Sequence, residues 1–410
     1  MISAIENETS RAASRSRPRL HRLRVLERSE PTQDSICLSF AVPPELYSDY
    51  IFQEGQFVAL EAEVDGELLR RNYSICSSVH RYHQTSIFSI GIRAIAKGRF
   101  SNWARDHLHP GSSLAVMTPD GRFVPPPPTG QAAARHATAA QLTPAQAIEA
   151  SHNGLKLPRS RHHLAFAGGS GITPILSILQ TRLMSEPSCR FSLVYGNRHR
   201  QSIMFFEALE DLKNQYMDRF QLIHVLSEEE GDLELHNGLL DQAKCAQLLK
   251  TLIAPAGVSV AYLCGPEPMM LAAQAALIET RVDRSKILME RFGSAVSGAG
   301  SVPAPMPKTD HFQAPADHCS VTINIDGKAR KLAVPRQGPS ILQMGLLAGM
   351  PLPFACQAAV CCTCRAKVMA GKVQMDKNYT LRDDEIAQGF VLTCQAHPLS
   401  DQVVLSFDER

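Results

Sequence analysis

Hydrophobic and polar positions follow three different patterns along the chain. From about residue 20 to 124, short runs such as SICLSFAV, QFVALEAEV and SIFSIGIRAI are separated by turn residues, which is typical of a small antiparallel β-barrel. From about 161 to 292, apolar runs alternate with helical patterns, which predicts a doubly wound α/β domain with a parallel sheet. From 319 onward, Asp326-Gly327 separates two β-rich runs, which predicts a hairpin. A short helix and a cysteine-rich loop follow it.

Two stretches between these patterns lack sustained periodicity. Residues 125–160 begin with four prolines, which predicts a linker or surface insertion, with a short helix capped by Thr143 inside it. Residues 293–318 are rich in Gly, Ala, Ser and Pro, which predicts a flexible tether. The expected organisation is a disordered tail at 1–19, a flavin-type barrel at 20–124, the insertion at 125–160, a nucleotide-binding domain at 161–292, the tether at 293–318 and a last domain at 319–410.

Composition and charge narrow the range of possible functions. The chain is 44% hydrophobic and 20% charged, which is ordinary for globular proteins. Its 42 basic and 40 acidic residues give a net charge of +2, too balanced for a protein that neutralises nucleic-acid phosphates. No apolar run approaches the roughly 18 residues of a membrane span. The N-terminal residues lack an apolar signal region, and Glu6 and Glu8 argue against a transit peptide, so we expect a cytoplasmic protein without nucleic-acid or membrane partners.

The strongest chemical signal is a group of cysteines near the C-terminus. Cys356, Cys361 and Cys364 follow the spacing Cys-x4-Cys-x2-Cys, and Cys394 follows later in the chain. Four thiolates at this spacing predict a plant-type [2Fe–2S] cluster. A structural zinc site is the alternative, but it usually pairs two Cys-x2-Cys knuckles. The adjacent Cys362 could replace Cys361 as a ligand; the spacing favours Cys361 and makes Cys362 a small packing residue.

A flavin site is predicted where Arg71-Asn72-Tyr73-Ser74 follows an apolar strand. Arg71 can pair with a phosphate, Tyr73 can stack on an isoalloxazine ring, and the Ser74 hydroxyl can hydrogen-bond the ring nitrogen that receives hydride. Such a short motif arises easily by chance. Further candidates follow in the order that a flavin-binding barrel needs, namely Arg93, Gly98 and Ser101.

A nucleotide-binding turn is predicted where LAFAGGSGITP joins a strand to a helix. Gly168, Gly169 and Gly171 permit close approach of a pyrophosphate to the helix N-terminus, although the sequence is not G-x-G-x-x-G. Thr173 could hydrogen-bond the ligand or simply cap the helix.

A second ligand loop and a phosphate site are expected at the same edge of the sheet. Cys264 and Gly265 end another apolar strand and open a helix. Arg198 and Ser202 follow the VYGN strand and could hold an adenosine 2′-phosphate, which favours NADPH over NADH.

Together these features resemble the ferredoxin–NADP reductase-like family in its three-part form, with a flavin barrel, a nicotinamide domain and a C-terminal ferredoxin. The resemblance covers about residues 20–410 and rests on RRNYSICSS, AGGSGITP, VYGNR, CGPEPMM, MERFGS and GFVLTCQAH. It implies bound FAD, NADPH as the electron donor, and a [2Fe–2S] cluster in an α+β domain of the β-grasp fold. Lys97 departs from the family pattern, because relatives often have Gly there.

The resemblance also implies residue roles. Arg71, Tyr73 and Ser74 would hold the flavin, with Gly98 and Ser101 near its phosphates. The residues expected to line the nicotinamide are Gly169, Gly171, Thr173 and Cys264. Ser74, Cys264 and Phe292 are the expected catalytic residues, and Phe292 would cover the flavin face.

Within the family, the motifs are most similar to the reductase components of phenylacetyl-CoA epoxidases. This implies delivery of electrons to a separate di-iron oxygenase subunit that epoxidises phenylacetyl-CoA. Two alternatives remain open: a reductase for another oxygenase, such as a Rieske-type system, and a redox-sensing or electron-storage protein.

Overall fold

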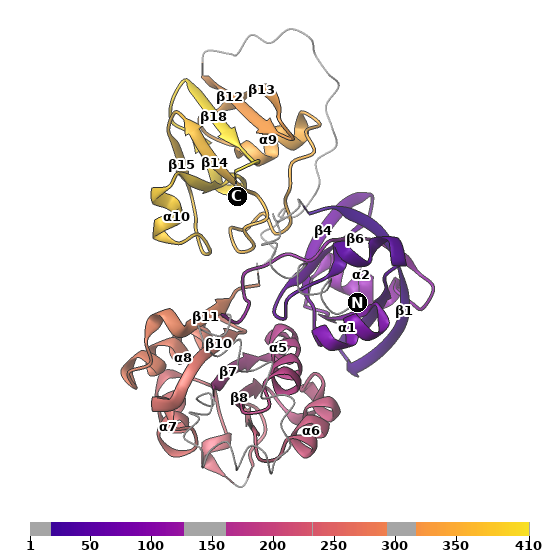
Figure 1. The fold of residues 1–410 in the computed structure, drawn as a ribbon, viewed down its shortest axis with the longest axis vertical. Helices are drawn as coiled ribbons and strands as arrows, with labels where there is room; N and C mark the ends of the chain where they lie inside the picture. Colours follow the sequence, from indigo (N-terminus) through magenta and orange to yellow (C-terminus); the bar gives the residue numbers. More distant parts are fainter. Residues whose placement is uncertain (1–17, 127–160, 232, 293–316, 410) are drawn as a thin grey trace, which may run out of the picture.

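The computed structural model describes residues 18–126, 161–231, 233–292 and 317–409. The short helix expected after Thr143 and most of the two predicted linkers lie outside these residues. Figure 1 shows three folded parts, with the N-terminal part beside the middle part and the C-terminal part above both.

The N-terminal part is an antiparallel sheet that curves into a half-barrel, in the strand order β4-β3-β6-β1-β2-β5. An isolated bridge between Ile75 and Ile90 brings the end of β4 to β5. The Asp65-Gly66 turn between β3 and β4 has positive φ at both residues, as a two-residue hairpin requires. The elements are β1 Leu20–Thr32, β2 Ser35–Ala41, β3 Phe57–Val64, β4 Glu67–Ser74, α1 Val79–Thr85, β5 Ile87–Arg93, α2 Arg99–His107 and β6 Ser113–Met117.

The middle part is a parallel sheet in the order β11-β10-β7-β8-β9 with helices on both faces. All seven residues of the central strand β7 are buried, as expected for a parallel strand covered on both sides. Helices α5 and α6 pack with one core cluster, and α7 and α8 with another. The elements are β7 His162–Gly168, α5 Ile172–Ser185, β8 Arg190–Asn197, α6 Phe206–Gln215, β9 Phe220–Leu226, α7 Gln242–Thr251, β10 Val258–Cys264, α8 Glu267–Glu279 and β11 Ile287–Glu290.

The C-terminal part is an α+β domain with a mixed sheet in the order β13-β12-β18-β14-β16. The predicted hairpin is confirmed, because β12 and β13 pair from Ile325↔Lys328 outward around Asp326-Gly327. The elements are β12 His318–Ile325, β13 Lys328–Pro335, α9 Ile341–Leu347, β14 Arg365–Ala370, β15 Val373–Met375, α10 Asp383–Ala387, β16 Phe390–Leu392, β17 Ala396–Pro398 and β18 Gln402–Ser406. No helix in the described ranges is long and apolar enough to cross a membrane.

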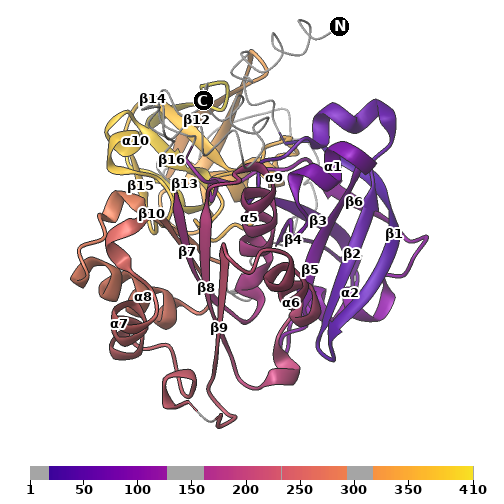
Figure 2. The same ribbon diagram turned by 60° about the horizontal axis from the view of Figure 1, so that its bottom comes forward.

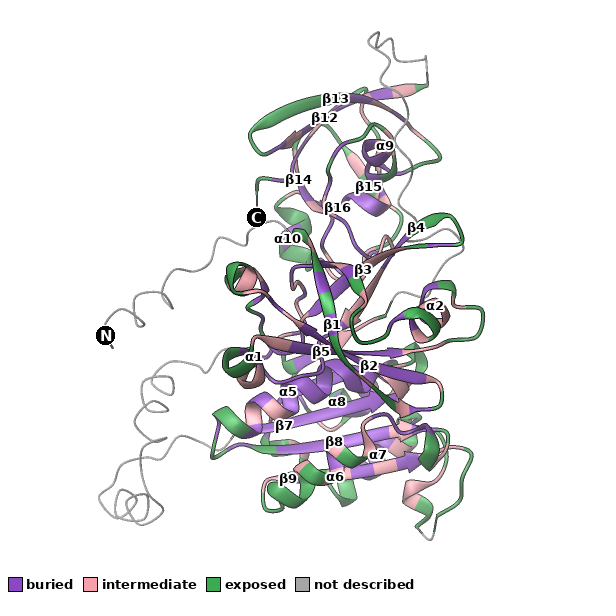
Figure 3. Ribbon diagram, turned by 90° about the vertical axis from the view of Figure 1, so that its right-hand side faces the viewer, coloured by how far each residue is buried: buried purple, intermediate pink, exposed green. Residues whose placement is uncertain are grey.

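Helix α5 fastens the parallel-sheet domain to the half-barrel. The Ser177 hydroxyl donates to the carbonyl of Ser77 at 2.7 Å, and the Val79 amide donates to Thr181 Oγ1 at 3.2 Å. The next residue, Arg182, pairs with Glu54 of the half-barrel. Residues 173, 177 and 181 share one helix face, so this face fixes how the two domains meet. Figure 3 shows how much of this region is buried.

Candidate functional site

Three of the four predicted cluster ligands lie in a loop with an unusual backbone, and Cys394 reaches them from the turn after β16. Cys361, Cys364 and Cys394 are buried and Cys356 is half-buried. The Cys356 amide donates to Cys361 Sγ at 3.5 Å. A hydrogen bond with Cys394, and then burial, raises the pKa of Cys364 well above its usual value. Thiols packed this closely need a bound cation to become thiolates, so this donor set fits the predicted iron–sulfur cluster.

The loop distinguishes the two adjacent cysteines. Cys361 packs against the half-barrel, whereas Cys362 packs against the core of its own domain. The Cys362 thiol donates to Thr380 Oγ1 at 2.9 Å, and its backbone has a φ of 59°. Gln357 and Ala359 also have positive φ, a costly conformation for residues other than glycine. This backbone turns the side chains of Cys361 and Cys362 in different directions, which favours Cys361 as the ligand.

The candidate flavin strand is β4. Ser74 Oγ is buried and has no hydrogen-bond partner among the described residues, so it could accept or donate a bond to a bound ring. Arg71 donates to the carbonyl of Arg70 at 2.9 Å. Burial lowers the pKa of Arg71 and raises that of Tyr73. A half-buried guanidinium, an aromatic ring and an unpaired hydroxyl on one strand fit the predicted flavin.

Helix α2 begins beside this strand. Gly98 is its N-cap, and a Cβ at Gly98 would lie only 2.6 Å from Ser101 Oγ. The Ser101 hydroxyl accepts from the amide of Ile95 at 3.3 Å and thereby closes the preceding turn. Lys97 takes the left-handed conformation, with a φ of 60°. The first amides of α2 suit a phosphate, and the Phe100 ring lies 5.9 Å from the ring of Tyr73.

The glycine turn after β7 packs tightly against the loop after β10. A Cβ on Gly171 would lie 2.1 Å from the carbonyl oxygen of Cys264, so only glycine fits there. Thr173 Oγ1 donates to the carbonyl of Ser170 at 3.1 Å, and its methyl group faces Gly91 of β5. The Cys264 thiol is buried, and burial raises its pKa well above the usual value. It is therefore a neutral thiol at the strand end.

A cavity of about 630 Å³ opens at the carboxyl ends of β7, β8 and β9. This is the edge where doubly wound sheets bind nucleotides. Gly168, Gly169, Arg198 and Ser202 line it, and so does Pro266 of the second ligand loop. Asn197 also lines the cavity, and both side-chain amide atoms are buried without a hydrogen-bond partner among the described residues. Sequence reasoning missed Asn197, although it ends the VYGN strand.

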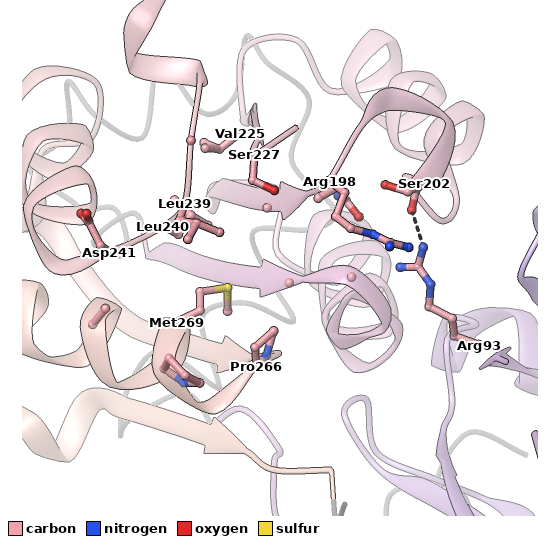
Figure 4. Close-up of a pocket in the computed structure, with 17 residues that line it drawn as sticks. Arg93, Arg198, Ser202, Val225, Ser227, Leu239, Leu240, Asp241, Pro266 and Met269 are labelled. Carbon is pink, nitrogen blue, oxygen red and sulfur yellow. Dashed lines mark hydrogen bonds between the residues drawn. The ribbon is translucent and has the colours of Figure 1, made fainter. Parts of the chain in front are cut away.

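Arg93 lies at this cavity, although it was predicted for the flavin. Its guanidinium donates to Asp34 Oδ2 at 2.8 Å and to the carbonyl of Ser202 at 3.2 Å. Figure 4 shows Arg93 and Arg198 reaching the same end of the cavity from two domains. Two cations beside Ser202 make this end suitable for a phosphate group.

The three domains meet at the end of β11. Glu290 is the strand partner of Cys264. Burial, followed by the charges of Cys361 and Asp120, raises the pKa of Glu290 to about 8. Phe292, two residues on, keeps 42% of its surface exposed. Glu290 was not singled out from the sequence, because the contacts that distinguish it come from three separate domains.

Comparisons with known proteins agree with this architecture. Residues 22–124 match the oxidoreductase FAD-binding domain, residues 166–275 the oxidoreductase NAD-binding domain, and residues 323–399 the 2Fe-2S iron-sulfur cluster binding domain. One component of the 1,2-phenylacetyl-CoA epoxidase of Escherichia coli K12 is 38% identical over 95% of this chain and 98% of its own length. The chain belongs to the FAD- and [2Fe–2S]-containing reductase components of oxygenases.

Other members of this reductase family serve different oxygenases. The ferredoxin reductase component of 3-ketosteroid-9-alpha-monooxygenase from Rhodococcus rhodochrous is 29% identical over 92% of this chain and 94% of that protein. The solved structure of phthalate dioxygenase reductase aligns over 95% of this chain and 98% of its own, with a TM-score of 0.51 and 18% identity. The reductase therefore shares its three-domain fold with proteins that differ widely in sequence.

Proposed function

We propose that this reductase takes electrons from NADPH and passes them through FAD and a [2Fe–2S] cluster to a di-iron oxygenase subunit that epoxidises phenylacetyl-CoA. The observation that carries the proposal is that the three domains meet at Glu290 of β11, which is the strand partner of Cys264 and lies close enough to Cys361 of the cluster loop and Asp120 of the half-barrel to interact with their charges. The substrate and the oxygenase type rest on the 38% identity to the epoxidase component over nearly the whole chain.

The roles of the chain's residues follow from their positions. Arg71, Tyr73 and the α2 N-terminus would hold FAD, and Ser74 would hydrogen-bond its ring. Cys264 and Phe292 would line the place where the nicotinamide and flavin rings meet. When bound, FAD accepts two electrons together from NADPH and releases them singly. Cys356, Cys361, Cys364 and Cys394 would hold the cluster that carries each electron onward.

The preference for NADPH is supported by charge. Arg93, Arg198 and Ser202 lie at one end of the nucleotide cavity, where a 2′-phosphate could be bound. A cytoplasmic location is supported by the seven cysteines outside the cluster set, all of which are free thiols, because thiols stay reduced in that compartment.

The proposal is tested by reconstitution. The purified, cofactor-loaded reductase is mixed with the di-iron oxygenase subunit, phenylacetyl-CoA and either NADPH or NADH, and the epoxide is quantified by mass spectrometry. We expect product with NADPH and at least tenfold less with NADH at equal low concentration. Absence of product, with NADPH still reducing cytochrome c, would favour a different oxygenase partner. Failure to reduce any external acceptor would favour a sensing or storage role.

A further inference from the structure

The cluster-bearing loop rests directly on the flavin-binding half-barrel, and the contact is small. Its apolar part consists of Phe57, Ala59 and Met117 of the half-barrel against Ala355 and the ligand Cys361. Cys361 is only 6% exposed in this arrangement. Figure 3 shows the C-terminal domain standing over β3 and β4. One edge of the cluster site is therefore covered by the half-barrel.

Three polar contacts surround this apolar patch. Arg122 Nη1 donates to Glu385 Oε2 at 2.7 Å, and Thr363 Oγ1 donates to Asp120 Oδ2 at 2.9 Å. The third contact runs from Arg70 Nη1 to the carbonyl of Phe354 at 2.8 Å, with the guanidinium 4.0 Å above the Phe354 ring. We call Phe354, Ala355, Cys361, Thr363 and Glu385 the cluster face.

Three of the four charged members of this contact also have a partner in their own domain. Glu385 pairs with Arg365 at 3.2 Å and accepts the Arg382 amide at 3.1 Å. Arg70 pairs with Glu61 at 2.6 Å, and Asp120 accepts the Gly121 amide at 2.8 Å. Arg122 is already 28% exposed. Separation of the two domains therefore leaves no buried charge unpaired, which is the main cost of breaking a buried ion pair.

We infer that the cluster face is also the surface that docks the protein electron acceptor, so that the half-barrel and the acceptor occupy it in turn. The inference rests on the proposed function. A single electron crosses this surface to the acceptor, and no bond is made or broken. The half-barrel shows which chemistry the face accepts: a small apolar patch beside an arginine or lysine that meets Glu385. An acceptor with such a patch would bind only after the half-barrel is released.

Hydrogen–deuterium exchange on the full-length, cofactor-loaded reductase tests, without relying on activity, whether the acceptor displaces the half-barrel from the cluster face. A saturating amount of the oxygenase subunit should speed exchange about tenfold in the half-barrel peptides 57–60 and 114–122. Peptides covering 354–364 should stay protected, because one partner replaces the other. Unchanged half-barrel peptides, or an acceptor footprint elsewhere on the C-terminal domain, would overturn the inference. If the oxygenase subunit does not bind, the proposed function fails, and the same experiment with cytochrome c decides the inference.

We expect two substitutions at this contact to change the affinity for the acceptor in different ways. Arg122→Gln removes a contact of the half-barrel only, so more molecules have a free cluster face and the apparent Kd for the acceptor should fall about fivefold. Glu385→Gln keeps the helix cap, because glutamine also serves at this position. It removes the charge that both partners use, so it should not tighten acceptor binding. Equal tightening in both variants, or no change in either, would contradict a shared face.

Two control variants keep this comparison interpretable. Arg122→Lys retains the charge and should bind the acceptor as the parent does. Arg105→Gln removes an exposed arginine of α2 that pairs with Asp106 at 3.0 Å, and it should also leave the acceptor Kd unchanged.

Discussion

The interdomain ion pair of Arg182 predicts a large loss of stability when the cation is removed. The Arg182 side chain is 15% exposed, and its two carboxylate partners Glu54 and Glu186 are 8% and 5% exposed. In Arg182→Met, Glu186 keeps Arg161 at 3.3 Å and His163 at 3.3 Å, but Glu54 loses its ion pair. Breaking a buried pair from one side costs about 3–5 kcal/mol.

The lower limit of about 3 kcal/mol corresponds to a fall in Tm of roughly 6–12 °C for a unit of this size. Differential scanning calorimetry of the cofactor-loaded protein measures it. Glu54→Gln combined with Arg182→Met removes the orphaned charge as well, and should recover about half of the loss. Lys213→Met removes an exposed pair with Glu210 at 3.7 Å and should change Tm by less than about 2 °C. A Tm change below about 2 °C for Arg182→Met, or a double variant with a lower Tm than Arg182→Met alone, would refute the reasoning.

The surroundings of Glu186 favour an ion network over a metal site. The ligand atoms of His163, Glu186 and Cys189 lie within 4.8 Å of one another, a spacing that could suit a metal ion. However, Arg161 and Arg182 already donate to Glu186, and Arg219 lies 4.0 Å from Cys189 Sγ. Three guanidinium groups repel a further cation. Burial raises the pKa of Glu186, but the hydrogen bonds and charges of His163 and Arg182 outweigh it and lower this pKa to about 2.

Three further predictions concern the cluster, the glycine turn and pH. Cys361→Ser should abolish the visible absorbance of the cluster, whereas Cys362→Ser should retain it; the opposite result would assign Cys362 as the ligand. Gly171→Ala should destabilise the protein by about 1–3 kcal/mol in urea unfolding, because its Cβ meets the Cys264 backbone, while Gly257→Ala, which meets nothing within 4 Å, should not. Burial lowers the pKa of His162 from 6.5 to about 4. The unfolded chain therefore takes up this proton at a higher pH than the folded protein does. About 3 kcal/mol of the free energy of unfolding is present above pH 6.5 and is lost as the pH falls toward 4. His162→Gln should flatten that part of the stability profile, and an unchanged profile would contradict the assignment.

Local patterns in the sequence were sufficient to predict the fold. Alternation in the runs around Leu38 and Leu60, and the apolar run of β7, predicted the half-barrel and the parallel sheet. Asp326-Gly327 predicted its hairpin because a two-residue turn is encoded by the residues that form it. The cysteine spacing likewise depends on one loop and one distant ligand.

Contacts between domains could not be predicted in the same way. Arg93 was expected at the flavin, but its partners are Asp34, in the turn between β1 and β2, and the carbonyl of Ser202 in the next domain. Arg122 and Glu385 are 263 residues apart. Their pairing depends on how separately folded domains meet, and no local periodicity reports it. Glu290 was missed for the same reason.

The order of electron flow within one chain is tested most directly by mixing the cofactor-loaded protein anaerobically with NADPH. Flavin absorbance is followed by stopped flow, and the reduced cluster by electron paramagnetic resonance of rapidly frozen samples. We predict that flavin absorbance falls first and that the cluster signal then rises. In Cys361→Ser, the first change should remain and the second should disappear. Cluster reduction that precedes flavin reduction, or a parent protein whose flavin is reduced while its cluster stays oxidised, would contradict the account.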